Sequence, residues 1–131
     1  AQLLKVKKIQ ALRKKNWHIF SNLINKLNTK KFYLIKANTK STSVYHILAL
    51  VFRDIKLANK FKDFVQKSEV AATFHYVPLH KSKMGIKFCK YKLPVTEGIF
   101  NWIVRLPLFS EMKQKEINKI SYLIKNFTLK Y

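Results

Sequence analysis

Two histidines five residues apart are the side chains of this sequence that offer the most varied chemistry. They are His75 and His80, in the stretch "TFHYVPLH" at residues 73–80. Imidazole rings can ligate a metal, exchange protons as an acid–base pair, or pack with their nitrogens satisfied by neighbouring groups. Which role applies depends on the residues that the rest of the chain supplies.

A zinc site is the most demanding of these roles. Zinc in proteins takes three or four side-chain ligands at characteristic spacings. Neither Cys89 nor His46 nor His18 completes a recognised spacing with the pair. We therefore expect no metal site.

Other reactive side chains give weaker signals. Cys89 has no visible activating partner for a nucleophilic role. His46 falls in a predicted central strand, where it is expected to pack, and Trp17 and His18 are expected to pack or to contact a partner surface. Arg105, in "RLPL", can reach an anion, although an arginine at a strand end is more often a surface ion-pair residue.

The strong positive charge suggests a polyanion partner, but its distribution argues against a dedicated site. The chain has 27 basic and 6 acidic residues and a net charge of +21, yet only Arg13, Arg53 and Arg105 are arginines. Bidentate phosphate and base recognition favours arginine. The lysines are scattered, with no run longer than two, so we expect a solvated surface and at most non-specific nucleic-acid binding.

Several protein classes are disfavoured by the hydrophobic pattern. The longest apolar stretch, residues 45–52, suits a buried strand and is far too short to span a bilayer. The lysine-interrupted start has no apolar core of a signal peptide. A single cysteine cannot form an intrachain disulfide, which fits a reducing compartment. We expect a cytoplasmic protein with no membrane partner.

Hydrophobic periodicity predicts alternating helices and short strands. Apolar residues at three- and four-residue spacing predict one long helix at 3–27. Further helices are predicted from Asp54 to about Ser68, shortly after Thr96, and from a cap at Ser110. Strands are predicted at 30–37, 44–52, 71–77 and 102–107, with an irregular segment at 79–93 that turns at Gly85.

This order of elements predicts a single α/β (α+β) domain over residues 1–131. A small, mostly antiparallel sheet would carry helices mainly on one face, together with the long N-terminal helix. The strand at 44–52 is apolar on both faces and is expected to be central.

Four motifs in this order resemble one enzyme family: "RKKNWHIF" (13–20), "VYHILALVF" (44–52), "ATFHYVPLH" (72–80) and "TEGIFNWIVRLPLF" (96–109). The chain resembles the C-terminal part of the DegT/DnrJ/StrS sugar-nucleotide aminotransferases, and within them the dTDP-4-amino-4,6-dideoxygalactose transaminases. The resemblance implies the small domain of a fold-type I aminotransferase. The chain departs from the family at Trp102, where arginine is usual, and at Ser68–Glu69, where a glycine normally ends the helix.

The resemblance also implies what the complete enzyme does. Such an enzyme uses pyridoxal 5'-phosphate to move an amino group, usually from glutamate, onto a 4-keto-6-deoxy sugar nucleotide for lipopolysaccharide or other cell-surface polysaccharides. A large domain supplies the Schiff-base lysine, and no lysine here matches it. We therefore expect this chain alone to bind no cofactor and to be inactive. Its partner would be the missing large domain or a second chain that supplies it.

By the same resemblance, the histidine segment faces the sugar-nucleotide substrate. The side chains implied as substrate contacts are His75, Tyr76, His80, Lys81 and Lys83. The competing interpretation is structural, with His75 packed on a strand and His80 in an exposed loop.

An uncovered apolar stripe on helix 3–27, around Trp17, would favour self-association. Two further functions stay open: a small basic polyanion-binding protein, and an inactive gene remnant.

Overall fold

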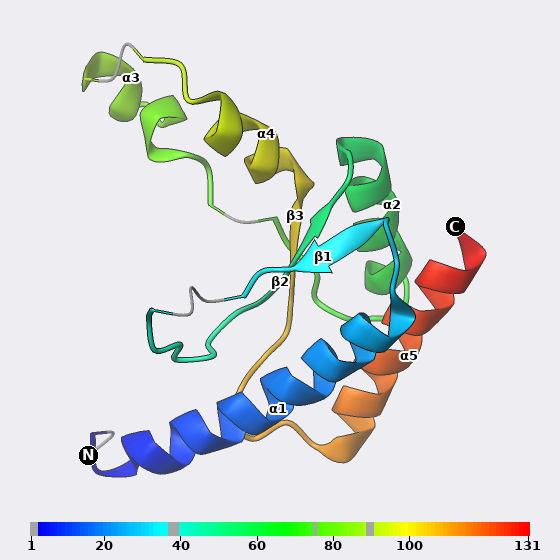
Figure 1. Ribbon diagram of the computed structural model, residues 1–131. Coiled ribbons are helices and arrows are strands. Elements are labelled where there is room, and N and C mark those ends of the chain that lie inside the picture. The colour runs from blue at the N-terminus through cyan, green and yellow to red at the C-terminus, as the bar shows by residue number, and fades with distance from the viewer. Residues whose placement is uncertain (1–2, 37–39, 75, 89–90) are drawn as a thin grey trace.

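A computed structural model of the chain describes residues 3–36, 40–74, 76–88 and 91–131 (Figure 1). The elements in chain order are η1 (Leu3–Lys5), α1 (Val6–Leu27), β1 (Phe32–Leu34), β2 (Leu48–Phe52), α2 (Ile55–Gln66), η2 (Leu79–Lys81), α3 (Gly85–Phe88), α4 (Pro94–Trp102), β3 (Ile103–Leu106) and α5 (Gln114–Lys130). The predicted long helix, the central strand and the closing helix are confirmed.

The three strands form one antiparallel sheet in the order β1-β2-β3. Strand β2 is central and all five of its residues are buried, as the sequence predicts for a strand covered on both faces. In β3, Val104 and Leu106 are buried and alternate with half-buried Ile103 and Arg105. Because side chains alternate between the faces of a strand, Arg105 points away from the core.

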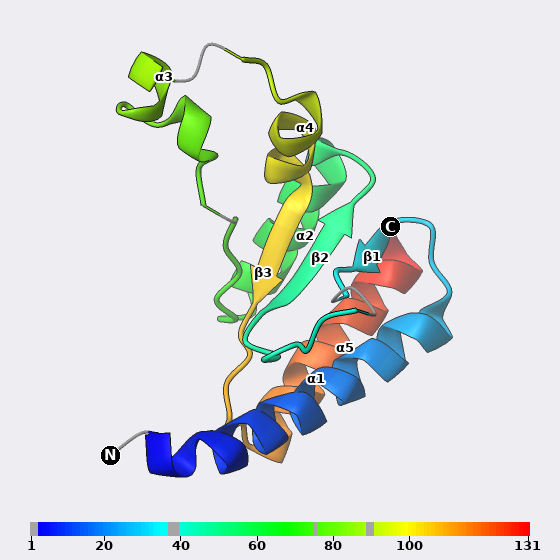
Figure 2. The ribbon, with the colours of Figure 1, turned by 60° about the vertical axis from the view of Figure 1, so that its left-hand side comes forward.

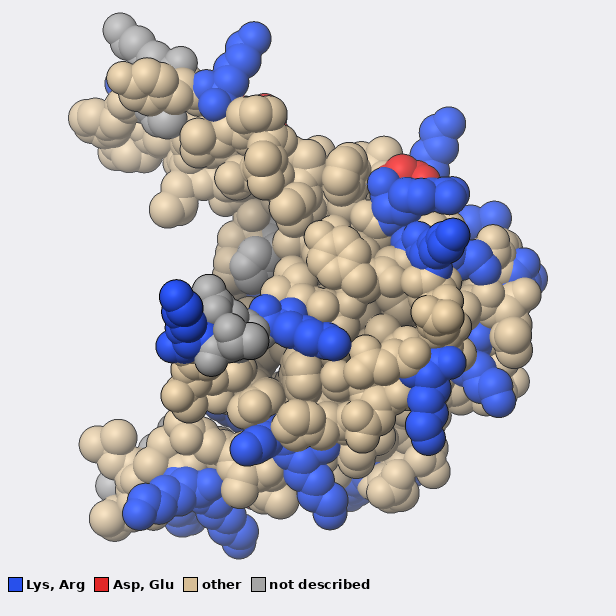
Figure 3. All heavy atoms as spheres, viewed as in Figure 1, with Lys and Arg blue, Asp and Glu red and all other residues tan. Residues whose placement is uncertain are grey.

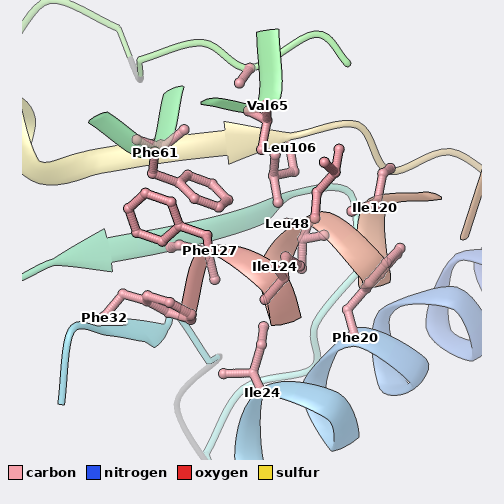
Figure 4. Packing of buried hydrophobic residues seen from close by; sticks show 14 of the residues in the cluster. Phe20, Ile24, Phe32, Leu48, Phe61, Val65, Leu106, Ile120, Ile124 and Phe127 are labelled. Atoms are coloured by element: carbon pink, nitrogen blue, oxygen red, sulfur yellow. The ribbon is translucent and has the colours of Figure 1, made fainter. Parts of the chain in front are cut away.

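The core lies on one face of the sheet and is covered by α1, α2 and α5. Figure 4 shows side chains from all three helices converging on residues of the sheet. Its centre is aromatic: the Phe61 ring centroid lies 4.9 Å from that of Phe52 and 5.0 Å from that of Phe127. The prediction of a small sheet with helices mainly on one face is confirmed.

Polar contacts explain where two of the helices begin. The Asp54 carboxylate accepts a hydrogen bond from the Leu57 N–H at 2.8 Å, so the predicted cap of α2 is confirmed. The predicted cap at Ser110 is wrong. The buried Asn16 amide donates to the Phe109 carbonyl at 3.0 Å and to the Ser110 carbonyl at 3.4 Å, and α5 starts only at Gln114.

The predicted strand at 71–77 is wrong over most of its described length. It is reduced to a single antiparallel bridge between Thr73 and Arg105. The same register would pair Ala71 with Pro107, which has no N–H to donate. The central strand is also shorter than predicted. It was expected to start at residue 44, but β2 starts at Leu48, so that His46 is exposed outside the strand. The prediction that His46 packs inside the strand is therefore wrong.

The segment predicted as irregular contains two short helices, η2 and α3, which pack against each other. Helix α4 begins at Pro94, before Thr96, because proline is well suited to the first helical position. We call η2, α3 and α4 the projecting lobe. Figures 1 and 2 show η2 and α3 standing away from the sheet and from α1 and α5, with α4 leading back into β3.

Candidate functional site

The projecting lobe exposes large apolar side chains. The most exposed are Leu79 at 85%, Phe88 at 80% and Val95 at 72%. In the view of Figure 3 this part of the surface is mostly free of charged side chains, whereas lysines and arginines are spread over the body. Soluble proteins rarely leave so many apolar groups in water unless a partner covers them.

The exposed apolar surface does not lie where the sequence placed it. On α1, Phe20 and Ile24 are buried and Trp17 is half-buried. The predicted open stripe around Trp17 is therefore wrong, because α5 and the sheet cover it. Just before this helix, in η1, Leu3 and Leu4 are 85% and 90% exposed.

A single carboxylate organises the histidine segment. Lys81 Nζ donates to Glu97 Oε2 at 2.7 Å, and His80 Nε2 lies 3.2 Å from Glu97 Oε1. The same Oε1 accepts the Leu93 N–H at 3.1 Å. The His80 side chain is only 9% exposed. Glu97 therefore ties η2 to the start of α4.

The hydrogen bond from Lys81 is the main reason that the pKa of Glu97 falls from 4.5 to about 2, and the Leu93 N–H contributes further. A carboxylate with a lowered folded-state pKa contributes stability that is fully present above its unfolded pKa. That contribution disappears as the pH falls from about 4.5 toward 2. The contacts of Glu97 are therefore fully formed at neutral pH.

Replacing Glu97 with glutamine is expected to remove this acid-sensitive contribution. The neutral amide cannot hold the Lys81 ammonium as an ion pair. The unfolding free energy should therefore change less between pH 5, above both pKa values of Glu97, and pH 3, which lies between the unfolded value of 4.5 and the folded value of about 2, than in the parent chain. Urea unfolding at both pH values measures this. Glu111→Gln, at an exposed carboxylate outside these contacts, is the matched control. An unchanged pH dependence in Glu97→Gln would contradict the assigned role.

The five side chains implied as substrate contacts do not form one cluster. His80 and Lys81 are held by Glu97, Lys83 is exposed in the turn before α3, and His75 lies outside the described residues. Tyr76 lies elsewhere, with the Arg105 guanidinium carbon 5.6 Å from its ring centroid. The expectation that His80 sits in an exposed loop does not match its buried ring.

Two surface hollows lie near residues that were singled out in the sequence. One, of about 560 Å³, lies in the projecting lobe between Leu79, Phe88 and Leu93, with His80 in its wall. The other, of about 230 Å³, has Ala49 of the central strand in its wall, together with Tyr45, His46 and Lys36. The second hollow therefore lies on the sheet face opposite the core.

An aromatic cluster borders the second hollow. The ring centroids of Trp17 and Tyr45 are 5.4 Å apart, and those of His18 and Tyr45 are 5.5 Å apart. Tyr45 has a φ of 48°, which is unusual for a bulky residue. Its backbone N–H donates to Ser43 Oγ at 3.1 Å, which helps to hold this turn. The rings of Trp17 and His18, which were expected to pack or to contact a partner surface, thus both pack against the Tyr45 ring.

Glu97 is the residue that the sequence reasoning missed. Its signal was present, since a proline at the first helical position followed by an acidic residue in the first turn is typical of a helix start. The pattern indicates that Glu97 is placed to accept backbone N–H groups. It does not indicate that two side chains from residues 80 and 81 would share the carboxylate.

The described residues do not fit the covalent site of pyridoxal phosphate. A Schiff-base lysine needs a desolvated or cationic surrounding that favours the neutral amine, and no described lysine is buried. None of the six carboxylates is buried either. Within the described ranges no three His, Cys, Asp or Glu side chains lie together as a metal site would require. None of the described helices is long and apolar enough to cross a membrane.

Comparison with protein families decides the relationship. The sequence pattern of the DegT/DnrJ/EryC1/StrS aminotransferase family matches residues 1–125. The chain belongs to this aminotransferase family. No curated protein is similar enough in sequence to count as a relative.

Solved aminotransferases share the fold. Helicobacter pylori PseC, an aminotransferase involved in the biosynthesis of pseudoaminic acid, superposes with a TM-score of 0.84 at 14% identity. The match covers 99% of this chain and 35% of that one. TlmJ from Streptoalloteichus hindustanus gives 0.85 at 16% identity, covering 98% and 34%. This member of the DegT family therefore spans about a third of the length of the solved aminotransferases it matches.

Proposed function

We propose that this chain is the C-terminal small domain of a pyridoxal phosphate-dependent sugar-nucleotide aminotransferase that works in the cytoplasm. The observation that carries the proposal is the family match over residues 1–125, on a fold that superposes on one third of solved aminotransferases. The reaction would transfer the amino group of an amino acid, glutamate by preference, to a 4-keto-6-deoxy sugar nucleotide. Its product would enter a cell-surface polysaccharide such as lipopolysaccharide.

The chain's own contribution would be docking and substrate recognition. Pyridoxal phosphate, when bound to the complete enzyme, supplies the electron sink for the amino transfer. The residues that hold it would come from the large domain, since the described lysines and carboxylates do not fit that task. Lys83 and Tyr76, both exposed, and the segment at His75 stay candidates for contact with the sugar nucleotide.

The projecting lobe is the surface that we assign to the large domain. Its large exposed apolar side chains, among them Leu79, Phe88 and Val95, lie together in one part of the chain. A net charge of +21 opposes association between two copies of the chain. A separate large domain with an apolar surface is therefore the better occupant of the lobe.

Complementation tests the proposal. The purified chain is mixed with the large domain of a family member, glutamate and a 4-keto-6-deoxy sugar nucleotide, and amino-sugar formation is followed. Activity is expected in the mixture and in neither component alone. Leu79→Asp should reduce it about tenfold or more by placing a charge in the docking surface. Leu129→Asp, on a side chain of α5 that is 73% exposed and outside the lobe, is the matched control.

Turnover by the chain alone would contradict the proposed division of labour. Silence in mixtures with large domains of several family members would favour an inactive remnant. Equal loss in the Leu79 and Leu129 variants would show that the lobe is not the docking surface.

A further inference from the structure

A third hollow, of about 460 Å³, lies between the end of α2 and the start of α5 and has no residue of the projecting lobe in its wall. Figures 1 and 2 show the start of α5 at the opposite end of the molecule from α3. The volume falls within the range of small-ligand sites, about 300–1,000 Å³. Val70 and Ile120 in its wall are buried, and Phe109 is 41% exposed. The hollow therefore offers an apolar surface to the body of a small molecule.

Charged groups of both signs border this hollow. Lys115 and Lys119 lie one turn apart on the same face of α5, and Glu69 lies in the turn after α2. All three side chains are exposed, and no ion pair joins them to each other or to another of the described residues. The fourth charged residue, Glu116, uses its Oε2 to accept the Lys113 N–H at 2.7 Å. Two ammonium groups and one carboxylate are thus available to a ligand.

The backbone of Glu69 is strained. Its φ of 57° lies in the left-handed region that favours glycine. The Val70 N–H donates to the Val65 carbonyl at 3.2 Å, and the Glu69 N–H donates to the Gln66 carbonyl at 2.8 Å. In this type of helix end, glycine is the usual residue at the position of Glu69. Strained residues gather at functional sites. The residue that strains this turn also brings a carboxylate to the hollow, so binding accounts for it better than folding does.

We propose that this hollow binds the amino-sugar phosphate part of the reaction product, with the phosphate on Lys115 and Lys119 and the ammonium on Glu69. The inference rests on the proposed function, because a sugar-nucleotide aminotransferase makes a molecule that carries an ammonium and a phosphate on one sugar. Charge-assisted hydrogen bonds from two lysines suit a phosphate, and one carboxylate suits an ammonium. The sugar ring lies between them on the apolar wall. This is a second product site, separate from the side chains proposed to contact the substrate.

Glucosamine 1-phosphate is the probe, because it carries both charged groups on a small sugar. It is titrated into the isolated chain in about 0.15 M KCl, which screens binding to scattered lysines, and backbone amide resonances are followed by NMR. We expect saturable shifts on both sides of the hollow, at Val70 and at Lys119. Glucosamine, which lacks the phosphate, and N-acetylglucosamine 1-phosphate, which lacks the ammonium, should each bind about tenfold more weakly or worse.

Variants on the two sides of the hollow assign the two charged groups. Glu69→Gly removes the carboxylate and relieves the left-handed backbone, so it should raise the urea midpoint while weakening binding of glucosamine 1-phosphate about tenfold. Loss of binding in a more stable chain cannot come from unfolding. Lys119→Gln should weaken binding of the same probe about tenfold, whereas Lys125→Gln, at an exposed side chain of α5 outside the hollow, should leave it unchanged.

Three results would overturn the inference. They are the absence of a saturable shift with glucosamine 1-phosphate, equal binding of N-acetylglucosamine 1-phosphate, and equal weakening by Lys119→Gln and Lys125→Gln. None of them depends on complementation. A silent mixture together with saturable binding in the hollow would sink the proposed function and leave the amino-sugar phosphate site standing, and an active mixture without such binding would do the reverse.

Discussion

Replacing Phe127 with alanine is expected to lower the free energy of unfolding by about 3–5 kcal/mol. The Phe127 side chain is fully buried, and its ring centroid lies 5.0 Å from that of Phe61 and 5.7 Å from that of Phe64. Truncation removes apolar contacts and leaves a cavity that the α2–α5 packing can only partly close. Since small domains are stable by about 5–15 kcal/mol, this single change should shift the urea midpoint strongly.

A matched variant on the same helix makes the expectation specific. Tyr122 on α5 is 64% exposed, so Tyr122→Ala should alter stability by no more than about 0.5 kcal/mol. Both variants are measured by urea unfolding under identical conditions. A loss below about 1 kcal/mol for Phe127→Ala would show that this aromatic cluster is not the centre of the fold.

Gly85→Ala is expected to disrupt the packing of η2 against α3. A Cβ at this position would clash with the Leu79 carbonyl oxygen and would lie 2.9 Å from the His80 Cα. Both atoms belong to the backbone, so the two short helices must move apart. Hydrogen exchange should then accelerate at the Ser82 and Ile86 amides, which the native fold bonds to the Leu79 and Ser82 carbonyls.

Gly98, the other glycine of the chain, provides a control for which no loss of stability is expected. A Cβ at Gly98 would meet only the Trp102 ring, at 3.8 Å, which is ordinary contact. Because Gly98 lies inside α4, Gly98→Ala should be neutral or stabilise by up to about 1 kcal/mol. Unchanged exchange in Gly85→Ala would mean that η2 and α3 do not pack as described.

Local sequence signals predicted the elements that are stabilised by contacts between near neighbours in the chain or by a continuous apolar face toward the core. The apolar stripe of α5, ending at Phe127, and the cap at Asp54 each specify an element with little help from distant residues. The all-apolar run of β2 likewise required cover on both faces. The family resemblance, carried by four motifs, was confirmed over residues 1–125.

The errors arose where a distant residue decides the outcome. The strand expected at 71–77 has suitable alternation, but its partner at one end is Pro107, which the segment's own sequence does not reveal. Asn16, more than ninety residues earlier in the chain, holds the Phe109 and Ser110 carbonyls, and α5 begins only at Gln114, where the Glu116 carboxylate accepts the Lys113 N–H at 2.7 Å. His80 faces Glu97 across seventeen residues, so sequence spacing could not show that its ring is buried.

The contacts of Glu97 also bear on how this protein can evolve. Those contacts, with Lys81, His80 and Leu93, share no residue with the aromatic core around Phe127. Substitutions at sites without shared partners usually add independently. The stability cost of a substitution in the projecting lobe should therefore add to that of a substitution in the aromatic core, without amplifying it. A stabilising change in the core, far from the lobe, could then offset a destabilising change at the contacts of Glu97.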